Sequence, residues 1–173
     1  MPSASTEAST DTASVARAYF DAIRRRDLDG MVAVWEPGST DRLNGMADLS
    51  VPEGLRDWFG SLFAAFPDFR MEVVDLVVEG ESAAVRWHAT GTFDGSGQFE
   101  GMDPTGATVD ITGFDLLTIR DGRVQHNEAY VNGAHMAQQL GALPESGSMQ
   151  ERAMTGALNL KTRLTQLIRR QTS

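Results

Sequence analysis

Polar side chains recur at every second position in the segment from Val124 to Asn132. If this segment is a strand, its side chains alternate between two faces. One face then carries His126, Glu128, Tyr130 and Asn132. A carboxylate beside an imidazole raises the imidazole pKa and orients the ring, which suits general acid–base catalysis. Burying such a face costs free energy unless each polar group has a partner, so it looks either into solvent or into a polar cavity.

Two earlier segments with alternating patterns offer further candidates. In residues 83–93, Arg86 and His88 share one face, and either that face or the opposite apolar face points inward. In residues 107–119, Asp115 lies between apolar neighbours on the mainly apolar face. A carboxyl in such surroundings is either paired or has a raised pKa, which makes Asp115 a candidate pocket group.

The sequence contains no motif for metal or cofactor chemistry. The absence of cysteine excludes a disulfide framework, a thiolate metal site and a cysteine nucleophile. His88, His126 and Glu128 would hold a metal only if the fold gathered them, and their spacing does not require it. No phosphate-binding loop, nucleophile elbow or dinucleotide fingerprint occurs. We therefore expect no metal site and no cofactor.

Apolar residues at helical spacing dominate the first part of the chain. They predict helices over residues 15–26, 28–35 and 55–66. Start signals lie at residues 50–53 and a stop signal at Pro67. The aromatic residues of these helices either form core or line a pocket, and three are candidate substrate contacts. These are Trp35, Trp58 and Phe59.

From Phe69 onward the hydrophobic period changes to two. This period predicts four strands and a short closing helix, which span residues 69–78, 83–93, 107–119, 124–131 and 133–140. Helices followed by a run of antiparallel strands give an α+β layer fold. The helices are the only available cover for one face of the sheet, so a sheet that curls around them encloses a pocket.

The ends of the chain differ from its centre in composition. Residues 1–13 are rich in Ser, Thr and Ala and lack the features of a secretory signal, so we expect a disordered leader before a domain over residues 14–144. Residues 145–173 read as a flexible linker and a basic amphipathic helix. No apolar run approaches the roughly 18–20 residues that span a membrane, so no integral membrane segment is expected.

The charge is unevenly distributed. The chain has a formal net charge of −9. Residues 145–173 hold five basic and two acidic side chains, which leaves the remainder near −12. An acidic protein of this kind is not expected to bind nucleic acid, and the lack of cysteine fits a cytoplasmic location. We favour docking of the basic helix on an acidic domain, either its own or that of a neighbouring subunit. The alternative is binding to an anionic membrane or to an acidic partner.

Several motifs together resemble the SnoaL-like polyketide cyclase or ester cyclase family. They occur in order and with similar spacing between about residues 15 and 144, and they are Ala65–Phe69, Gly91–Phe93, Gly101–Gly106, Ile119–Val124 and Gln138–Pro144. The resemblance implies a nuclear transport factor 2-like cone, in which a curved antiparallel sheet wraps around N-terminal helices. It also implies a homodimer or a higher homo-oligomer.

The resemblance also implies a chemistry. Cyclases of this family look cofactor-free and use an acid on the last strand to move protons at carbon next to a carbonyl. That position falls on Asn132, a neutral amide, while Phe93 replaces a common histidine and Glu128 a common tryptophan. The resemblance places Glu128 and His126 on the pocket side. We therefore expect Glu128 to transfer the proton with His126, while Asn132 and Tyr130 donate hydrogen bonds to a substrate oxygen.

These observations leave three functional hypotheses. The first is a cofactor-independent cyclase or isomerase that acts on a hydrophobic carbonyl compound. The second is an activity like that of limonene epoxide hydrolases, with Arg86 and either Glu128 or Asp115 activating water, although their two-aspartate pattern is not found in the sequence. The third is a ligand-binding domain that has lost the family acid at Asn132.

Overall fold

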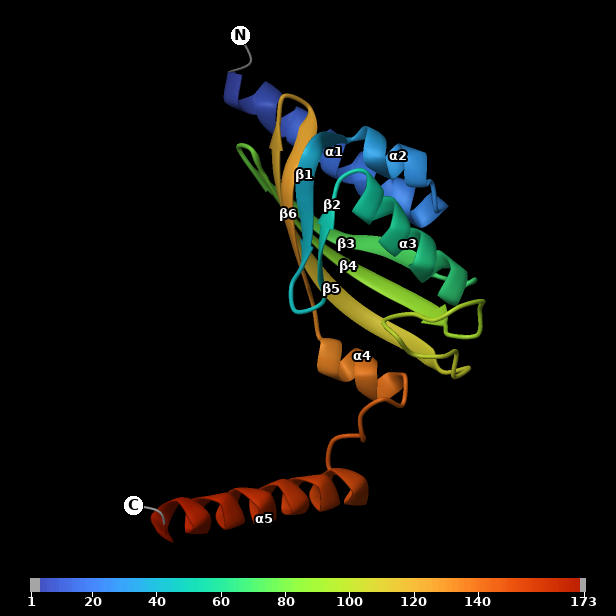
Figure 1. Ribbon diagram of the computed structural model, residues 1–173. Coiled ribbons are helices and arrows are strands. Elements are labelled where there is room, and N and C mark those ends of the chain that lie inside the picture. Colours follow the sequence, from blue (N-terminus) through green and yellow to red (C-terminus); the bar gives the residue numbers. More distant parts are fainter. Residues whose placement is uncertain (1–3, 172–173) are drawn as a thin grey trace.

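A computed structural model describes residues 4–171 as helices packed against one sheet, with an extended C-terminal segment (Figure 1). The helices are α1 (Ala4–Arg25), α2 (Leu28–Ala33), α3 (Glu53–Ala65), α4 (Gly133–Gln139) and α5 (Met149–Gln171). The strands are β1 (Trp35–Leu43), β2 (Ala47–Ser50), β3 (Arg70–Glu79), β4 (Ser82–Thr92), β5 (Thr108–Arg120) and β6 (Arg123–Val131). None of the helices within these residues is long and apolar enough to cross a membrane.

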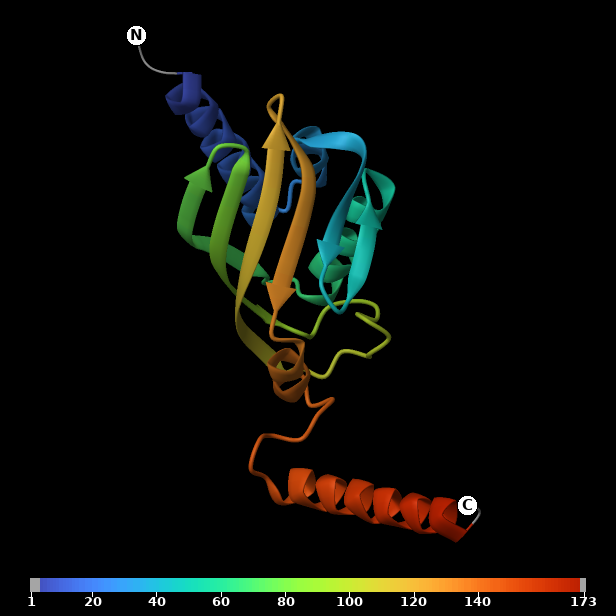
Figure 2. The same ribbon diagram turned by 90° about the vertical axis from the view of Figure 1, so that its left-hand side faces the viewer.

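The six strands form one curved sheet in the order β2-β1-β6-β5-β4-β3. Figure 2 shows the sheet in front, with α1, α2 and α3 behind it on the concave side. This arrangement confirms the predicted α+β cone. The sheet differs from the prediction in being mixed, because β1 runs parallel to β6 while every other neighbouring pair is antiparallel.

Strands β1 and β2 were not predicted from the sequence. The helix predicted over residues 28–35 ends at Trp35, but Trp35 begins β1. Proline and glycine are unusual inside strands, and Pro37 with Gly38 disguised the pattern; the register between β1 and β6 shifts at this point. The hairpin that follows turns over the three residues Asn44, Gly45 and Met46, and Asn–Gly is a dipeptide that strongly favours a hairpin.

The helical layer begins earlier than predicted. α1 starts at Ala4, so its first turns fall within residues 1–13, the predicted leader. Residues 1–3 of that leader lie outside the described residues. The inner side of α1 buries Tyr19, Phe20 and Ile23 against the sheet. These side chains close one side of the space that the curved sheet encloses.

One glycine lets a large ring lie flat on the sheet. Gly113 on β5 pairs with Trp87 on β4. A Cβ atom added to Gly113 would lie 2.0 Å from Cζ2 of Trp87, far inside van der Waals contact. Because Gly113 has no side chain, the Trp87 indole fits against it. The indole Nε1 then donates a hydrogen bond to Asp115, which lies two residues after Gly113 on β5.

We expect Gly113→Ala to lower the free energy of unfolding by about 3 kcal/mol, because overpacking of a buried site forces side-chain and backbone shifts. Urea denaturation followed by tryptophan fluorescence would measure it. Gly133→Ala is the matched control, since its added Cβ would meet no atom within 4 Å apart from its chain neighbours and its own helix backbone, and it should change stability by less than about 0.5 kcal/mol. Equal stability of the two variants would contradict this account of Trp87.

Candidate active site

A cavity of about 90 Å³ lies between the concave face of the sheet and helices α1 and α3. Most of its wall is apolar. Its aromatic residues are Tyr19, Phe20, Trp58, Phe59, Phe66, Phe69, Trp87 and Phe99. Among the described residues, no lysine, arginine or histidine lines this cavity. An anionic ligand would therefore find no counter-charge on the wall.

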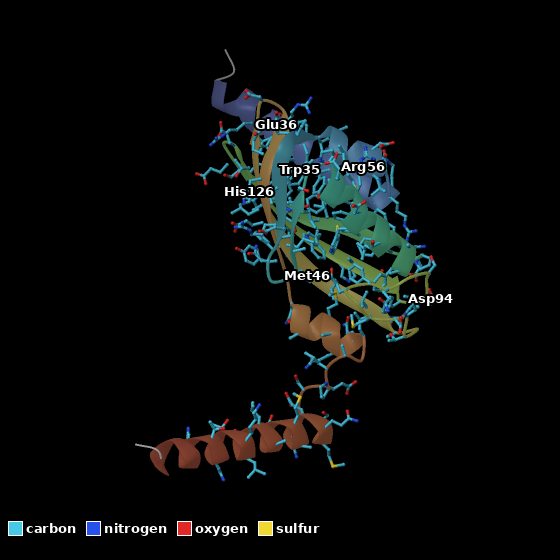
Figure 3. The ribbon with its side chains drawn as sticks, in the orientation of Figure 1. Trp35, Glu36, Met46, Arg56, Asp94 and His126 are labelled. Carbon is cyan, nitrogen blue, oxygen red and sulfur yellow. The ribbon has the colours of Figure 1, made fainter. Side chains whose placement is uncertain are left out.

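Partly exposed side chains mark the rim of the cavity. They are Met46 in the hairpin between β1 and β2, Trp58 on α3 and Met136 on α4. Figure 3 labels Met46 at that hairpin, near the end of the sheet that faces α4. An apolar cavity of roughly 150 Å³ is enough to hold benzene. A ligand of that size or larger therefore requires these flexible side chains to move outward.

A chain of buried hydrogen bonds joins several residues of the cavity wall. The Tyr19 hydroxyl donates to Oδ2 of Asp41 over 2.9 Å. The Asn127 amide nitrogen donates to Oδ1 of Asp41 over 2.9 Å and to Oδ2 of Asp115 over 2.7 Å. Trp87 Nε1 donates to Oδ1 of Asp115 over 2.7 Å. Each oxygen of both carboxyl groups thus accepts a hydrogen bond, which fixes the orientation of the pair.

The order of the strands creates this arrangement. β6 lies between β1 and β5. Asp41 on β1 pairs directly with Asn127 on β6. Asp115 on β5 pairs with Ala129, the next inward position on β6. The amide of Asn127 therefore lies between the two carboxyl groups, while α1 supplies Tyr19 and β4 supplies Trp87.

Burial gives both carboxyl groups an unusual acidity. It raises the pKa of Asp115 to about 7, with a further rise from the negative charge of Asp41, against the opposing hydrogen bonds from Trp87 and Asn127. Burial also raises the pKa of Asp41 to about 6, against hydrogen bonds from Tyr19 and Asn127. The pKa of Tyr19 is raised well above its ordinary value, first by burial and then by Asp41. The carboxyl pair can therefore accept and donate protons near neutral pH.

Of the residues predicted from the sequence, three line this cavity. They are Asp115, Trp58 and Phe59. Asp115 is buried, as its apolar neighbours on β5 indicated. Trp35 is buried beside Tyr19, with 5.5 Å between their ring centroids, but does not line the cavity. Trp35 therefore packs against Tyr19 in the core next to the cavity.

The polar face of β6 points the other way. His126, Glu128 and Tyr130 lie on the outer face of the sheet, and Figure 3 shows His126 on the side away from the helices. Tyr130 donates a hydrogen bond to Glu128 over 2.8 Å, and this bond, followed by the influence of His126, whose Nε2 lies 3.6 Å from the Glu128 carboxylate, lowers the pKa of Glu128. A poised catalytic base would need the opposite shift. Glu128 and His126 do not line the cavity, whereas the carboxyl-bearing residues Asp41 and Asp115 do.

A bulge in β6 explains why simple alternation wrongly placed Val124 on the same face as His126 and Glu128. Thr118 pairs with His126, but the next residue, Ile119, pairs with Val124, which leaves Gln125 as an extra residue on β6. Beyond the bulge the inward positions are Asn127, Ala129 and Val131 instead of the even-numbered ones. The alternation of inward and outward side chains therefore holds on each side of the bulge but not across it.

The remaining predicted groups also lie away from the cavity. Arg86 is on the outer face of β4, where its Nε donates to Asp75 over 2.7 Å. His88 on the same face contacts Asp110 at 2.8 Å. Asn132 caps α4, since its Oδ1 accepts a hydrogen bond from the backbone nitrogen of His135 over 3.0 Å. The position that the resemblance assigned to the family acid is thus a helix cap.

Four residues of the hydrogen-bonded chain escaped the sequence analysis. Trp87 and Asn127 lie on the faces of residues 83–93 and 124–132 opposite to the candidate polar groups, and Tyr19 lies in the helix predicted over residues 15–26. Asp41 lay in a segment with no assigned strand. The Asn44–Gly45 turn was the available signal, because a hairpin there puts Asp41 in phase with Leu43 on an inward face.

Comparisons with known proteins agree with the fold. Residues 13–140 match the family model of the SnoaL-like polyketide cyclases. A solved protein from Jannaschia sp. CCS1 that bears this family's name is 24% identical, covers 79% of this chain and 96% of its own, and has a TM-score of 0.70. No curated protein matches the sequence.

Two Streptomyces structures are also similar. AclR from Streptomyces galilaeus is 23% identical, covers 91% of this chain and 96% of its own, and has a TM-score of 0.69. IdmH from Streptomyces antibioticus is 26% identical, covers 75% of this chain and 98% of its own, and has a TM-score of 0.64.

The raised pKa values predict how stability depends on pH. A carboxyl whose pKa is higher in the folded than in the unfolded protein binds more protons when folded, so the free energy of unfolding falls as pH rises from about 4 to about 7. Each unit by which a pKa differs between the folded and the unfolded protein changes the free energy of unfolding by about 1.4 kcal/mol. We expect a fall of several kcal/mol for the wild type in urea titrations across this range, and a shallower fall for Asp115→Asn.

The control for this titration is Asp94→Asn, which removes an exposed carboxyl in the loop between β4 and β5. It should keep the wild-type slope. A slope that is the same in the Asp115→Asn and Asp94→Asn proteins would show that the buried carboxyl does not titrate with folding.

Proposed function

Because this chain belongs to the SnoaL-like polyketide cyclase family, we propose that it is an enzyme that moves protons on a hydrophobic carbonyl compound without a cofactor. The observation that carries this proposal is the pair of buried carboxyl groups on the cavity wall, Asp41 and Asp115, joined by the Asn127 amide. The reaction type is cyclisation or isomerisation.

The wall of the cavity supports an uncharged ligand. Its apolar and aromatic side chains favour a hydrophobic body, while the two aspartates are the only acidic residues on the described wall. A carboxylate or phosphate would meet the charge of Asp41 in a region with little water, which is strongly unfavourable. A ketone presents a single oxygen that accepts a hydrogen bond, so it fits this distribution.

The two pKa values suggest separate roles. The negative charge of Asp41 adds to burial in raising the pKa of Asp115, whereas hydrogen bonds from Tyr19 and Asn127 oppose the effect of burial on Asp41, so Asp41 is the candidate for the ionised base and Asp115 for the acid. Asp41 removes a proton from the carbon next to the carbonyl, and Asp115 donates its proton to the carbonyl oxygen. The α-carbon of the resulting enol then attacks a second carbonyl while the enol O–H proton returns to Asp115, and Asp41 gives its proton to the new alkoxide oxygen, which closes a ring. If the substrate is an unsaturated ketone, the intermediate is a dienol. Asp41 then delivers its proton to the γ-carbon while the O–H proton returns to Asp115, which shifts the double bond.

A second candidate reaction follows from the same pair. Two carboxyl groups facing one cavity, the pattern that the sequence did not reveal, can also open an epoxide. Asp41 would take a proton from a water molecule as the water oxygen attacks an epoxide carbon, and Asp115 would protonate the epoxide oxygen. The product is a diol. Arg86 has no part in this reaction, because it lies on the outer face.

Exchange of the methyl protons of acetophenone in D₂O, followed by NMR, tests the proposed base on a one-ring ketone. We expect the wild type to catalyse exchange and Asp41→Asn and Asp115→Asn to lose at least about 100-fold, the usual size of general acid–base contributions. Glu128→Gln is the matched control on the outer face and should stay within about twofold of the wild type.

Each result separates the hypotheses. Loss of exchange in Glu128→Gln but not in the aspartate variants would contradict the assignment of the base. Hydrolysis of styrene oxide without exchange on acetophenone would favour the epoxide reaction. Binding of acetophenone with neither reaction, unchanged in both aspartate variants, would favour a ligand-binding domain.

A further inference from the structure

A groove of about 350 Å³ lies between α3 and the loop that joins β4 to β5. Figure 1 shows this loop close to α3. One face of the helix and three consecutive loop residues line the groove. They are Gly54, Asp57, Trp58 and Ser61 from α3, and Gln98, Phe99 and Glu100 from the loop.

Two aromatic side chains separate this groove from the cavity that holds the carboxyl pair. Trp58 and Phe99 line both the cavity and the groove. Their rings pack edge to face, with 5.5 Å between the centroids. Phe99 is buried and Trp58 is partly exposed. A movement of these two rings would therefore join the cavity and the groove into one space.

The start of the loop is anchored to the end of α3. The backbone nitrogens of Gly95 and Ser96 donate hydrogen bonds to the carbonyl oxygens of Ala65 and Ala64, each over 3.0 Å. Beyond these two residues the loop continues towards its tip, which carries Phe99. The anchored start can therefore stay in place while the tip moves.

The tip of the loop is a tight turn with a weak link to α3. Phe99 and Met102 exchange two backbone hydrogen bonds, and Glu100 and Gly101 between them both have positive φ, as in a type I′ turn. Within the described residues, one hydrogen bond joins this turn to α3, from Trp58 Nε1 to Oε1 of Glu100 over 2.9 Å. Because Glu100 is exposed, water can replace the indole as its partner, so the bond can break at low cost.

The polar groups of the groove favour hydrogen-bond donors. Asp57 and Glu100 carry exposed carboxylates, which accept hydrogen bonds. Among the described residues, no lysine, arginine or histidine lines the groove. A hydroxyl group would find acceptors there, whereas a carboxylate would face two like charges, which is unfavourable.

We propose that Trp58 and Phe99 form a gate between the cavity and the groove, and that Asp57 and Glu100 select the far end of the ligand. The ligand is an elongated ketone whose far end donates a hydrogen bond in the groove, and an anionic far end is rejected. This inference rests on the proposed function, which places the ketone oxygen at the buried carboxyl pair.

The two volumes support a joined site. The cavity of about 90 Å³ is smaller than the roughly 150 Å³ that is enough to hold benzene. The cavity and the groove together fall within the roughly 300–1,000 Å³ that is typical of ligand pockets. When the gate opens, Phe99 gives up apolar contacts in the cavity wall, and the apolar body of the ligand replaces them.

Calorimetric titration of the full chain with two acetylbiphenyls tests the selection. The two ketones have the same length, but the far ring carries a para-hydroxyl in one and a para-carboxylate in the other. We expect the wild type to bind the hydroxyl compound at least tenfold more tightly. Asp57→Asn and Glu100→Gln should each lower this ratio of Kd values at least threefold, because each removes a negative charge from the groove.

The matched control is Asp94→Asn, which removes an exposed carboxyl from the same loop outside the groove and should keep the wild-type ratio. A ratio that is the same in the wild type, Asp57→Asn and Glu100→Gln would overturn the proposal. Failure of the wild type to bind either biphenyl ketone would also overturn it, whether or not acetophenone binds.

The NMR signal of the Trp58 indole N–H, assigned by its loss in Trp58→Phe, reports on the gate. It should shift when the hydroxyl compound binds, because the hydrogen bond to Glu100 breaks. An unshifted signal in the saturated protein would overturn the gate. Selective binding with the expected shift but without proton exchange would support this inference and contradict the proposed reaction, so the two failures are distinguishable.

Discussion

The contact on which the site depends is the amide of Asn127, which donates to two buried carboxyl groups at once. Two carboxyls this close to an apolar cavity would otherwise repel each other and lack solvation. The amide satisfies one oxygen of each, and Tyr19 and Trp87 satisfy the other two. Three features of the fold position these hydrogen bonds. They are the parallel strand β1, the central strand β6 and the glycine opposite the Trp87 ring.

Most of the fold could be predicted from the sequence, because period alone separates the helical from the stranded half of the chain. The apolar stripe of α3 and the alternation in β3, β4 and β5 have no competing signal. β1 was lost because Pro37 and Gly38 break its pattern, and the register shift there accommodates them. The bulge in β6 reversed the inferred faces, since Val124 and Asn127 are both buried although they are three residues apart.

The site was less predictable than the fold. Asp115 was identified because a lone carboxyl among apolar neighbours implies burial or pairing. Its partner Asp41 lies in the unrecognised β1, and Tyr19 looks like any aromatic core residue of α1. The family resemblance found the correct architecture but directed attention to Glu128. A shared fold transfers more reliably than the position of an acid, because a single bulge moves side chains from one face of a sheet to the other.

The parallel pairing of β1 with β6 has a consequence for how the protein folds. Asp41 and Asn127 are 86 residues apart, so the carboxyl pair is assembled by one of the longest-range contacts in the chain. Contacts of this range carry a large loop-closure cost and tend to form late. Until β6 inserts between β1 and β5, both carboxyls are hydrated and ionised at neutral pH. The insertion step should therefore take up a proton from solvent, which couples the last stage of folding to the creation of the acid.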